Sequence, residues 1–139
     1  DPAEAPATVP GLDVLPVWAR TKGAGVTVAL VDTGIDPGQA DYAPNLVPGW
    51  NFFDNTSDTT DGFAHGTLLA SIIAAASGNG SYVGIAPDAT LMPLKIMGGQ
   101  SGGEWSDTAP AKAIEYAVAH GARVINCSWG GSTPARSRA

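Results

Sequence analysis

Asp32 and His65 are the two residues of this sequence whose types and surroundings best suit proton transfer. Asp32 directly follows the apolar run 26–31, and His65 opens the apolar segment 65–76, which has helical spacing. A carboxylate can accept the imidazole Nδ1–H, fix the tautomer and stabilise the imidazolium that forms when Nε2 takes a proton. If the fold brings the two side chains together, the pair predicts general acid–base catalysis.

Each residue also has a structural interpretation that involves no chemistry. An aspartate before Thr33 and Gly34 is typical of a turn, and a histidine at the start of a helix can serve as a cap. A helix N-terminus would nevertheless disfavour a positive charge on resting His65 and keep it ready as a base. From spacing alone, both interpretations stay open.

Strands and helices alternate in the pattern around this pair. Strands are predicted at 26–31, 46–53, 90–97 and 123–128, and Pro48 places the second of them at an edge. Helices are predicted at 65–76 and 107–120, after a short helix or turn at 12–20. This alternation is typical of βαβ units and predicts an α/β fold with a mainly parallel sheet. Ligands of such sheets bind beyond the carboxyl ends of the strands, which is where Asp32 lies.

The two longer helices carry apolar residues at helical spacing, which predicts the faces that they bury. In 65–76 these residues are Leu68, Leu69, Ile72, Ile73 and Ala76. In 107–120 they are Ile114, Ala117 and Val118, with Ser106 or Asp107 as the N-cap and Gly121 as the C-terminal stop.

Four motifs follow one another along the chain: VDTGID (31–36), HGT (65–67), VGIAP (83–87) and VINCSWGG (124–131). In this order and spacing they closely resemble the subtilisin-like serine proteases, or subtilases, over about residues 12–131. The resemblance implies a subtilisin-like parallel-sheet fold of which this chain holds only the N-terminal strands and helices. It also implies a serine endopeptidase in which Asp32 is the acid and His65 the general base of an Asp/His/Ser triad.

The same resemblance implies where a polypeptide substrate binds. The segment 128–130 would pair with the substrate backbone, and the loop 98–103 would form the opposing strand. The implied substrate-binding residues are Gly98, Gly99, Gln100, Ser101, Gly102, Ser128, Trp129 and Gly130. Without the resemblance, both segments would be ordinary flexible loops at strand ends.

Subtilases carry their nucleophile in a Gly-Thr-Ser-Met-Ala-type motif and their oxyanion asparagine on another loop, and neither motif occurs in this sequence. Ser101 fits a G-x-S-x-G pattern, but a nucleophile elbow leads directly into a helix, and the predicted helix begins several residues later. We therefore expect this chain to be inactive alone, with the serine and the oxyanion asparagine in a missing C-terminal half.

Three explanations of the missing half stay open: a second polypeptide that completes the enzyme, a truncation, or a catalytically inactive subtilase-like module that binds peptides or a partner. The resemblance places the strand 123–128 at the centre of a larger sheet, so its open edge would pair with the C-terminal half or with a second copy. Arg136 and Arg138 fit a processing site, or they belong to a polar tail.

Composition excludes several other classes of protein. The 139 residues include 13 acidic and 7 scattered basic ones, for a net charge of −6, which argues against nucleic-acid binding. A single cysteine excludes an internal disulfide, and no apolar run is long enough to span a membrane. Composition marks a Pro/Ala-rich arm at 1–11. The subtilase resemblance implies a protease domain, its N-terminal part, at 12–133, a tail or cleavage end at 134–139, and a secreted or cell-envelope protein.

The chemistry requires no cofactor, but a structural calcium ion is possible by resemblance. Its candidate ligands are Asp41 and Asn79. Asp54, Asp58 and Asp61 lie on a loop rich in Asn, Thr and Ser, which predicts a solvated acidic surface rather than a second site.

Overall fold

The computed structural model describes residues 12–78, 82–98, 104–105 and 108–130. Its elements in chain order are α1 (Leu15–Trp18), β1 (Thr27–Asp32), a 3₁₀ turn (Ala43–Asn45), β2 (Trp50–Asn51), α2 (His65–Ala74), β3 (Thr90–Lys95), β4 (Met97–Gly98), β5 (Glu104–Trp105), α3 (Ala109–Ala119) and β6 (Val124–Asn126). No described helix has the length and apolar character needed to cross a membrane.

Four of the strands form a parallel sheet in the order β2-β3-β1-β6, which confirms the predicted α/β class. Strand β1 lies inside the sheet and is buried from Val28 to Asp32, as expected for an apolar run with neighbours on both edges. Its register pairs Asp32 with Lys95 on β3 and Leu30 with Asn126 on β6. Strand β2, which follows Pro48, lies at one edge as predicted.

The predicted strand 90–97 is wrong at its end. Strand β3 stops at Lys95, and Met97–Gly98 pairs instead with Glu104–Trp105 as a separate antiparallel ribbon. The Ile96 N–H still bonds to the Asp32 carbonyl, so the chain leaves the sheet just past the end of β1. The ribbon therefore begins at the carboxyl edge of the sheet, close to Asp32.

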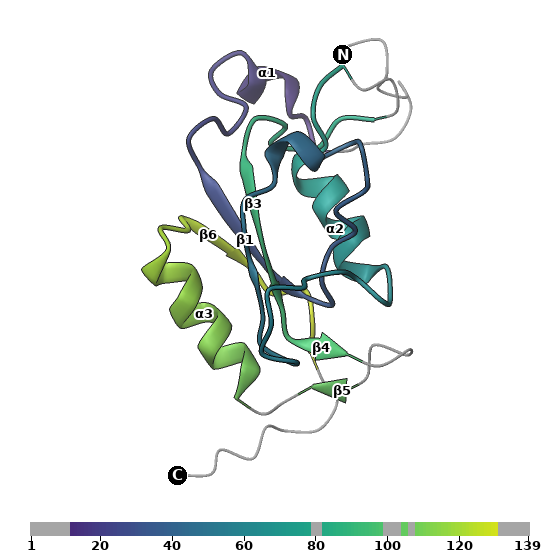
Figure 1. The fold of residues 1–139 in the computed structure, drawn as a ribbon. Helices are drawn as coiled ribbons and strands as arrows, with labels where there is room; N and C mark the ends of the chain where they lie inside the picture. Colours follow the sequence, from purple (N-terminus) through teal and green to yellow (C-terminus); the bar gives the residue numbers. More distant parts are fainter. Residues whose placement is uncertain (1–11, 79–81, 99–103, 106–107, 131–139) are drawn as a thin grey trace.

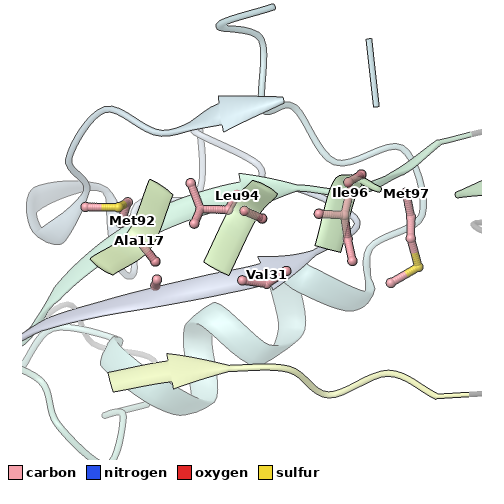
Figure 2. Packing of buried hydrophobic residues seen from close by; sticks show 9 residues of the cluster. Val31, Met92, Leu94, Ile96, Met97 and Ala117 are labelled. Carbon is pink, nitrogen blue, oxygen red and sulfur yellow. The ribbon is translucent and has the colours of Figure 1, made fainter. Parts of the chain in front are cut away.

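The helices cover opposite faces of the sheet, α2 on one and α3 on the other (Figure 1). On the α3 face, Val31, Leu94 and Ile96 of the sheet region are fully buried, and Ala117 of the helix lies in the same cluster, beside Met92 (Figure 2). On the α2 face, Leu30, Leu91 and Tyr42 pack against Ala70 and Ala74. We call these two clusters the α3 face and the α2 face.

The predicted inward face of α3 is wrong for two of its three residues. Ala117 is buried, but Ile114 is 39% exposed and Val118 is 66% exposed. The helix instead turns the alanine stripe Ala109, Ala113, Ala117 toward the sheet. The sheet supplies bulky side chains, so a close-packed interface needs small ones from the helix. Its N-cap is Thr108, with no side-chain cap bond, instead of Ser106 or Asp107, which lie outside the described residues.

Helix α2 shows the same preference for small residues. Gly66, Ala70, Ser71 and Ala74 are buried against the sheet, whereas Leu68 and Ile72 are 62% and 60% exposed. The prediction of a buried helix is therefore wrong for its outer side. Ile72 borders an apolar groove of about 370 Å³ between α2 and β6, which we call the α2–β6 groove. Its lining residues are Gly23, Val26, Val28, Ile72, Ile73, Ile85, Ala86, Ala89, Val124 and Asn126.

Candidate active site

Asp32 and His65 meet at the carboxyl end of β1. The His65 Nδ1 lies 2.7 Å from Asp32 Oδ1, with the carboxylate side chain 0% and the imidazole 40% exposed. A buried aspartate on Nδ1 sets the tautomer in which Nδ1 carries the proton, so Nε2 is the nitrogen left for proton transfer. The arrangement can therefore hold a half-exposed imidazole as a base and stabilise its charged form.

The backbone around the pair fixes this geometry. Asp32 Oδ1 also accepts the Thr33 N–H at 2.8 Å, and Thr33 Oγ1 accepts the Gly66 N–H at 3.0 Å. A Cβ atom at Gly66 would lie 2.1 Å from the Gly34 carbonyl oxygen, so a larger residue could not bring the first turn of α2 so close to β1. The DTG and HGT motifs thus hold each other in place, a contact that reasoning from spacing did not identify.

The segment that follows β6 lies against the end of β1. The Trp129 indole N–H donates to the Val31 carbonyl at 2.7 Å, and its ring packs against the cluster that includes Met97. The Ser128 hydroxyl and the Asn126 amide bond to each other at 3.0 Å. The segment 128–130 therefore runs next to the strand that ends in Asp32, where a substrate-binding segment is expected.

Gly98 is the described residue of the predicted opposing loop. It pairs with Glu104 in the β4–β5 ribbon, and a Cβ atom on it would lie 2.3 Å from the Phe53 ring. The remaining predicted residues of this loop, Gly99, Gln100, Ser101 and Gly102, lie outside the described residues. The role of the loop in substrate binding stays a prediction.

Cys127 lies between β6 and this segment with its thiol free and exposed. Partial burial raises the pKa of the Cys127 thiol, and the negative charge of Asp32 raises it further. A raised pKa keeps the thiol protonated, which is the less nucleophilic form. The direction of the shift therefore disfavours Cys127 as a nucleophile.

The calcium prediction lies partly outside the described residues. The Asp41 carbonyl oxygen accepts the Ala76 N–H at 2.7 Å, and Asn79 lies outside the described residues. The described part of the chain holds no group of three or more His, Cys, Asp or Glu residues that could bind a metal ion. A calcium site at Asp41 and Asn79 stays a prediction.

Comparisons with known proteins agree with this fold and geometry. The chain is 39% identical to thermitase of Thermoactinomyces vulgaris over 83% of its own length and 41% of that protein. It is 36% identical to the major intracellular serine protease of Bacillus subtilis, over 83% of this chain and 37% of that protein. In each case the chain spans less than half of the relative.

Solved structures show the same likeness. The crystal structure of fervidolysin from Fervidobacterium pennivorans, described as a keratinolytic enzyme related to subtilisin, superposes with a TM-score of 0.74 at 33% identity. The match covers 84% of this chain and 19% of that one. The model of the subtilase family matches residues 23–139. With the fold, the paired motifs and most of the sequence in agreement, the chain belongs to the subtilase family.

Proposed function

We propose that this chain supplies the acid and the base of a serine endopeptidase that hydrolyses peptide bonds. Asp32 orients and stabilises the imidazole, and His65 takes the proton of a serine nucleophile and then gives it to the leaving amine. The observation that carries the proposal is the 2.7 Å contact between a fully buried Asp32 and a half-exposed His65. This is the geometry that a base needs, because one nitrogen is fixed while the other faces a reactant.

The nucleophile and the oxyanion donor come, in this proposal, from sequence outside the chain. The described serines nearest to the motifs are engaged elsewhere, since Ser71 Oγ donates to the Thr67 carbonyl and Ser128 pairs with Asn126. A base and its acid cannot form an acyl-enzyme without a nucleophile. The chain by itself is therefore expected to be inactive.

The α2–β6 groove supports docking of that further sequence. It combines an almost wholly apolar lining with a strand, β6, that pairs only with β1 among the described residues. An apolar groove beside an open strand edge suits a segment that adds backbone pairing and an apolar side-chain surface. The groove meets α2 at Ile72 and Ile73, near its C-terminal end, so a docked segment would have to continue along the helix to reach His65 at its start.

The proposal is tested with the chain co-expressed with the C-terminal half of the same protease. A fluorophosphonate serine probe should label the complex on the partner half and leave the isolated chain unlabelled. His65→Ala should lower kcat for peptide hydrolysis by about 10³-fold or more. His120→Ala is the matched control, because His120 bonds to the Tyr116 carbonyl on α3 and should leave kcat unchanged.

Two results would contradict this function. Labelling of the isolated chain at Ser101 would place the nucleophile within it. Equal peptide hydrolysis by the His65→Ala and His120→Ala complexes would remove His65 from the chemistry, and peptide binding without hydrolysis would indicate an inactive binding module. Intact mass of the native protein then shows whether the partner is a second chain, a second copy or a continuous sequence.

The proposal includes a polypeptide substrate, held between the loop 98–103 and the segment 128–130, and a secreted or cell-envelope location. The Trp129–Val31 hydrogen bond supports the first part, because it holds the segment beside Asp32. The location rests on the family resemblance. Fractionation of the source cells tests it, and a cytoplasmic protein would contradict it.

A further inference from the structure

Asp61 is bound far more closely into the active site than a solvated acidic loop residue would be. Its Oδ1 accepts the N–H groups of Phe63 and Ala64 at 2.8 and 3.0 Å. Its Oδ2 accepts both the N–H and the hydroxyl of Thr67, at 2.9 and 2.7 Å. One carboxylate therefore joins the loop before His65 to the first turn after it.

These bonds replace a helix cap that the local sequence lacks. The N-cap residue of α2 is Ala64, which has no side-chain oxygen to offer to the free N–H groups of the first turn. Thr33, directly after β1, accepts the Gly66 N–H, and Asp61, in the loop before the helix, accepts the Thr67 N–H. Because these N–H groups belong to the two residues after His65, they set the direction in which the histidine leaves the backbone.

Asp61 also holds the unusual backbone conformation of Ala64. The Ala64 φ of 75° is in the left-handed region, which a residue with a Cβ atom adopts only at a cost in free energy. Such a conformation persists when the surrounding contacts hold it. The bond from the Ala64 N–H to Asp61 is one of those contacts, and the next residue along the chain is His65.

The charged form of Asp61 is the one that the site stabilises. Partial burial raises the pKa of the Asp61 carboxyl, but hydrogen bonds from Phe63, Thr67 and Thr33 lower it by more, so the pKa lies below its ordinary value. The carboxyl is thus ionised and keeps both oxygens free to accept bonds at neutral pH. Both pairs of bonds described above need this form.

We propose that Asp61 is a positioning residue for His65: it fixes the loop and the first helical turn that direct the imidazole toward Asp32. The proposal rests on the proposed function, in which His65 is the base. Asp61 touches neither substrate nor the reacting atoms in this proposal. Its effect passes through the backbone on both sides of His65 and therefore appears in the chemical step.

Asp61→Asn tests the proposal in the assembled enzyme. An amide has one acceptor oxygen, so it can satisfy the Phe63 and Ala64 N–H groups or the Thr67 groups but not both pairs. We expect kcat to fall about 10- to 100-fold, as for a small misplacement of a catalytic group, with KM within about twofold of its original value. Asp58→Asn is the matched control, because that exposed carboxylate in the same loop bonds only locally, to Thr60, and both constants should stay unchanged.

A second pair of variants keeps the test decisive if Asp61→Asn fails to fold. Thr67→Val removes the hydroxyl that donates to Asp61 and accepts the Asp36 N–H, whereas Thr67→Ser keeps it. The valine variant should show a smaller loss of kcat than Asp61→Asn, and the serine variant should restore it. If Asp61→Asn does not fold and Thr67→Val has the same kcat as Thr67→Ser, the proposal is overturned.

The low-field proton resonance of His65 Nδ1–H bonded to Asp32 gives a readout that needs no activity. Asp61→Asn should shift or broaden it, and Asp58→Asn should leave it in place. A changed resonance in an enzyme that never hydrolyses peptides would support the positioning role while the proposed function fails. An unchanged resonance with unchanged kcat, or a loss carried by KM alone, would overturn the positioning role.

Discussion

The two faces of the sheet differ in how completely this chain covers them. On the α3 face, the alanine stripe of the helix closes over Val31, Leu94 and Ile96, which are all at most 1% exposed. On the α2 face, the helix closes over Leu30 and Leu91 but leaves the α2–β6 groove beside it. Both helices use small residues against the sheet, so the difference lies in what flanks them.

The two faces differ most in their exposed apolar side chains. Ile72 of α2, Ile85 of the following loop and Val124 of β6 line the groove and are 60%, 44% and 49% exposed, although all three are large apolar residues. Exposed apolar residues gathered along one groove mark a surface for another apolar element. The α3 face is a core in its own right, whereas the α2 face combines a core with a proposed docking surface.

The largest expected effect on stability comes from opening the closed face. Leu94→Ala removes a fully buried side chain from the centre of the α3 face, where the close-packed alanines of the helix cannot fill the space. We expect the free energy of unfolding to fall by about 3 kcal/mol in urea denaturation. Val118→Ala, at an exposed position of α3, should change it by less than about 0.5 kcal/mol. A similar cost for both variants would mean that the α3 face is not a closed core.

An effect of intermediate size, on the pH dependence of the free energy of unfolding, should distinguish the two faces. Tyr42 belongs to the α2 face, where burial raises its pKa from 10.0 to about 12, while the buried residues of the α3 face carry no titratable side chain. The folded state therefore holds this proton more tightly than the unfolded state. This contribution of Tyr42 to the free energy of unfolding is fully present below pH 10. It falls by about 2 kcal/mol as the pH rises toward 12.

Tyr42→Phe should remove that part of the alkaline loss. The substitution costs about 1 kcal/mol at neutral pH, because it deletes the hydroxyl that donates to the Asp36 carbonyl. Plotted against pH from 8 to 12, the free energies of unfolding of the two proteins should therefore cross, with the tyrosine protein about 1 kcal/mol more stable at pH 8 and about 1 kcal/mol less stable at pH 12. Parallel curves would show that Tyr42 does not titrate differently in the folded chain.

The smallest effect on the chain itself is expected at the open side of the α2 face. Ile72→Ser with Ile85→Ser should change the free energy of unfolding by less than about 1 kcal/mol, because both groove side chains are largely exposed. The same pair should abolish binding of the C-terminal half, measured by co-purification. Ile114→Ser with Val118→Ser on α3 is the matched control and should leave binding intact. Equal binding by both pairs would remove the docking role from the α2–β6 groove.

Sequence patterns predicted the elements better than the surfaces. An uninterrupted apolar run predicted β1 inside the sheet, and helical spacing predicted a helix that begins at His65, which is where α2 starts. The wrong inward faces have one cause. A prediction from helical spacing assigns the large apolar residues to the buried face. These helices instead pack against a sheet of bulky side chains mainly through glycine and alanine.

Asp61 shows a different limit of sequence reasoning. A carboxylate among Asn, Thr and Ser is typical of a solvated surface, and only the folded loop brings Phe63, Ala64 and Thr67 around it. The signal that could have identified it is the missing cap. Because Ala64 has no side-chain oxygen to cap α2, the acidic and hydroxyl residues shortly before it were candidate acceptors for the first-turn N–H groups.

The register of β1 determines whether a folded molecule can be active. Asp32 pairs with Lys95 on one side, and Leu30 pairs with Asn126 on the other. A slip of a single residue would turn every β1 side chain to the opposite face, because side chains alternate along a strand. The carboxylate would then face α3, across the sheet from His65. Molecules with misaligned strands would therefore lack the acid–base pair altogether, so that only correctly aligned molecules could carry proteolytic activity.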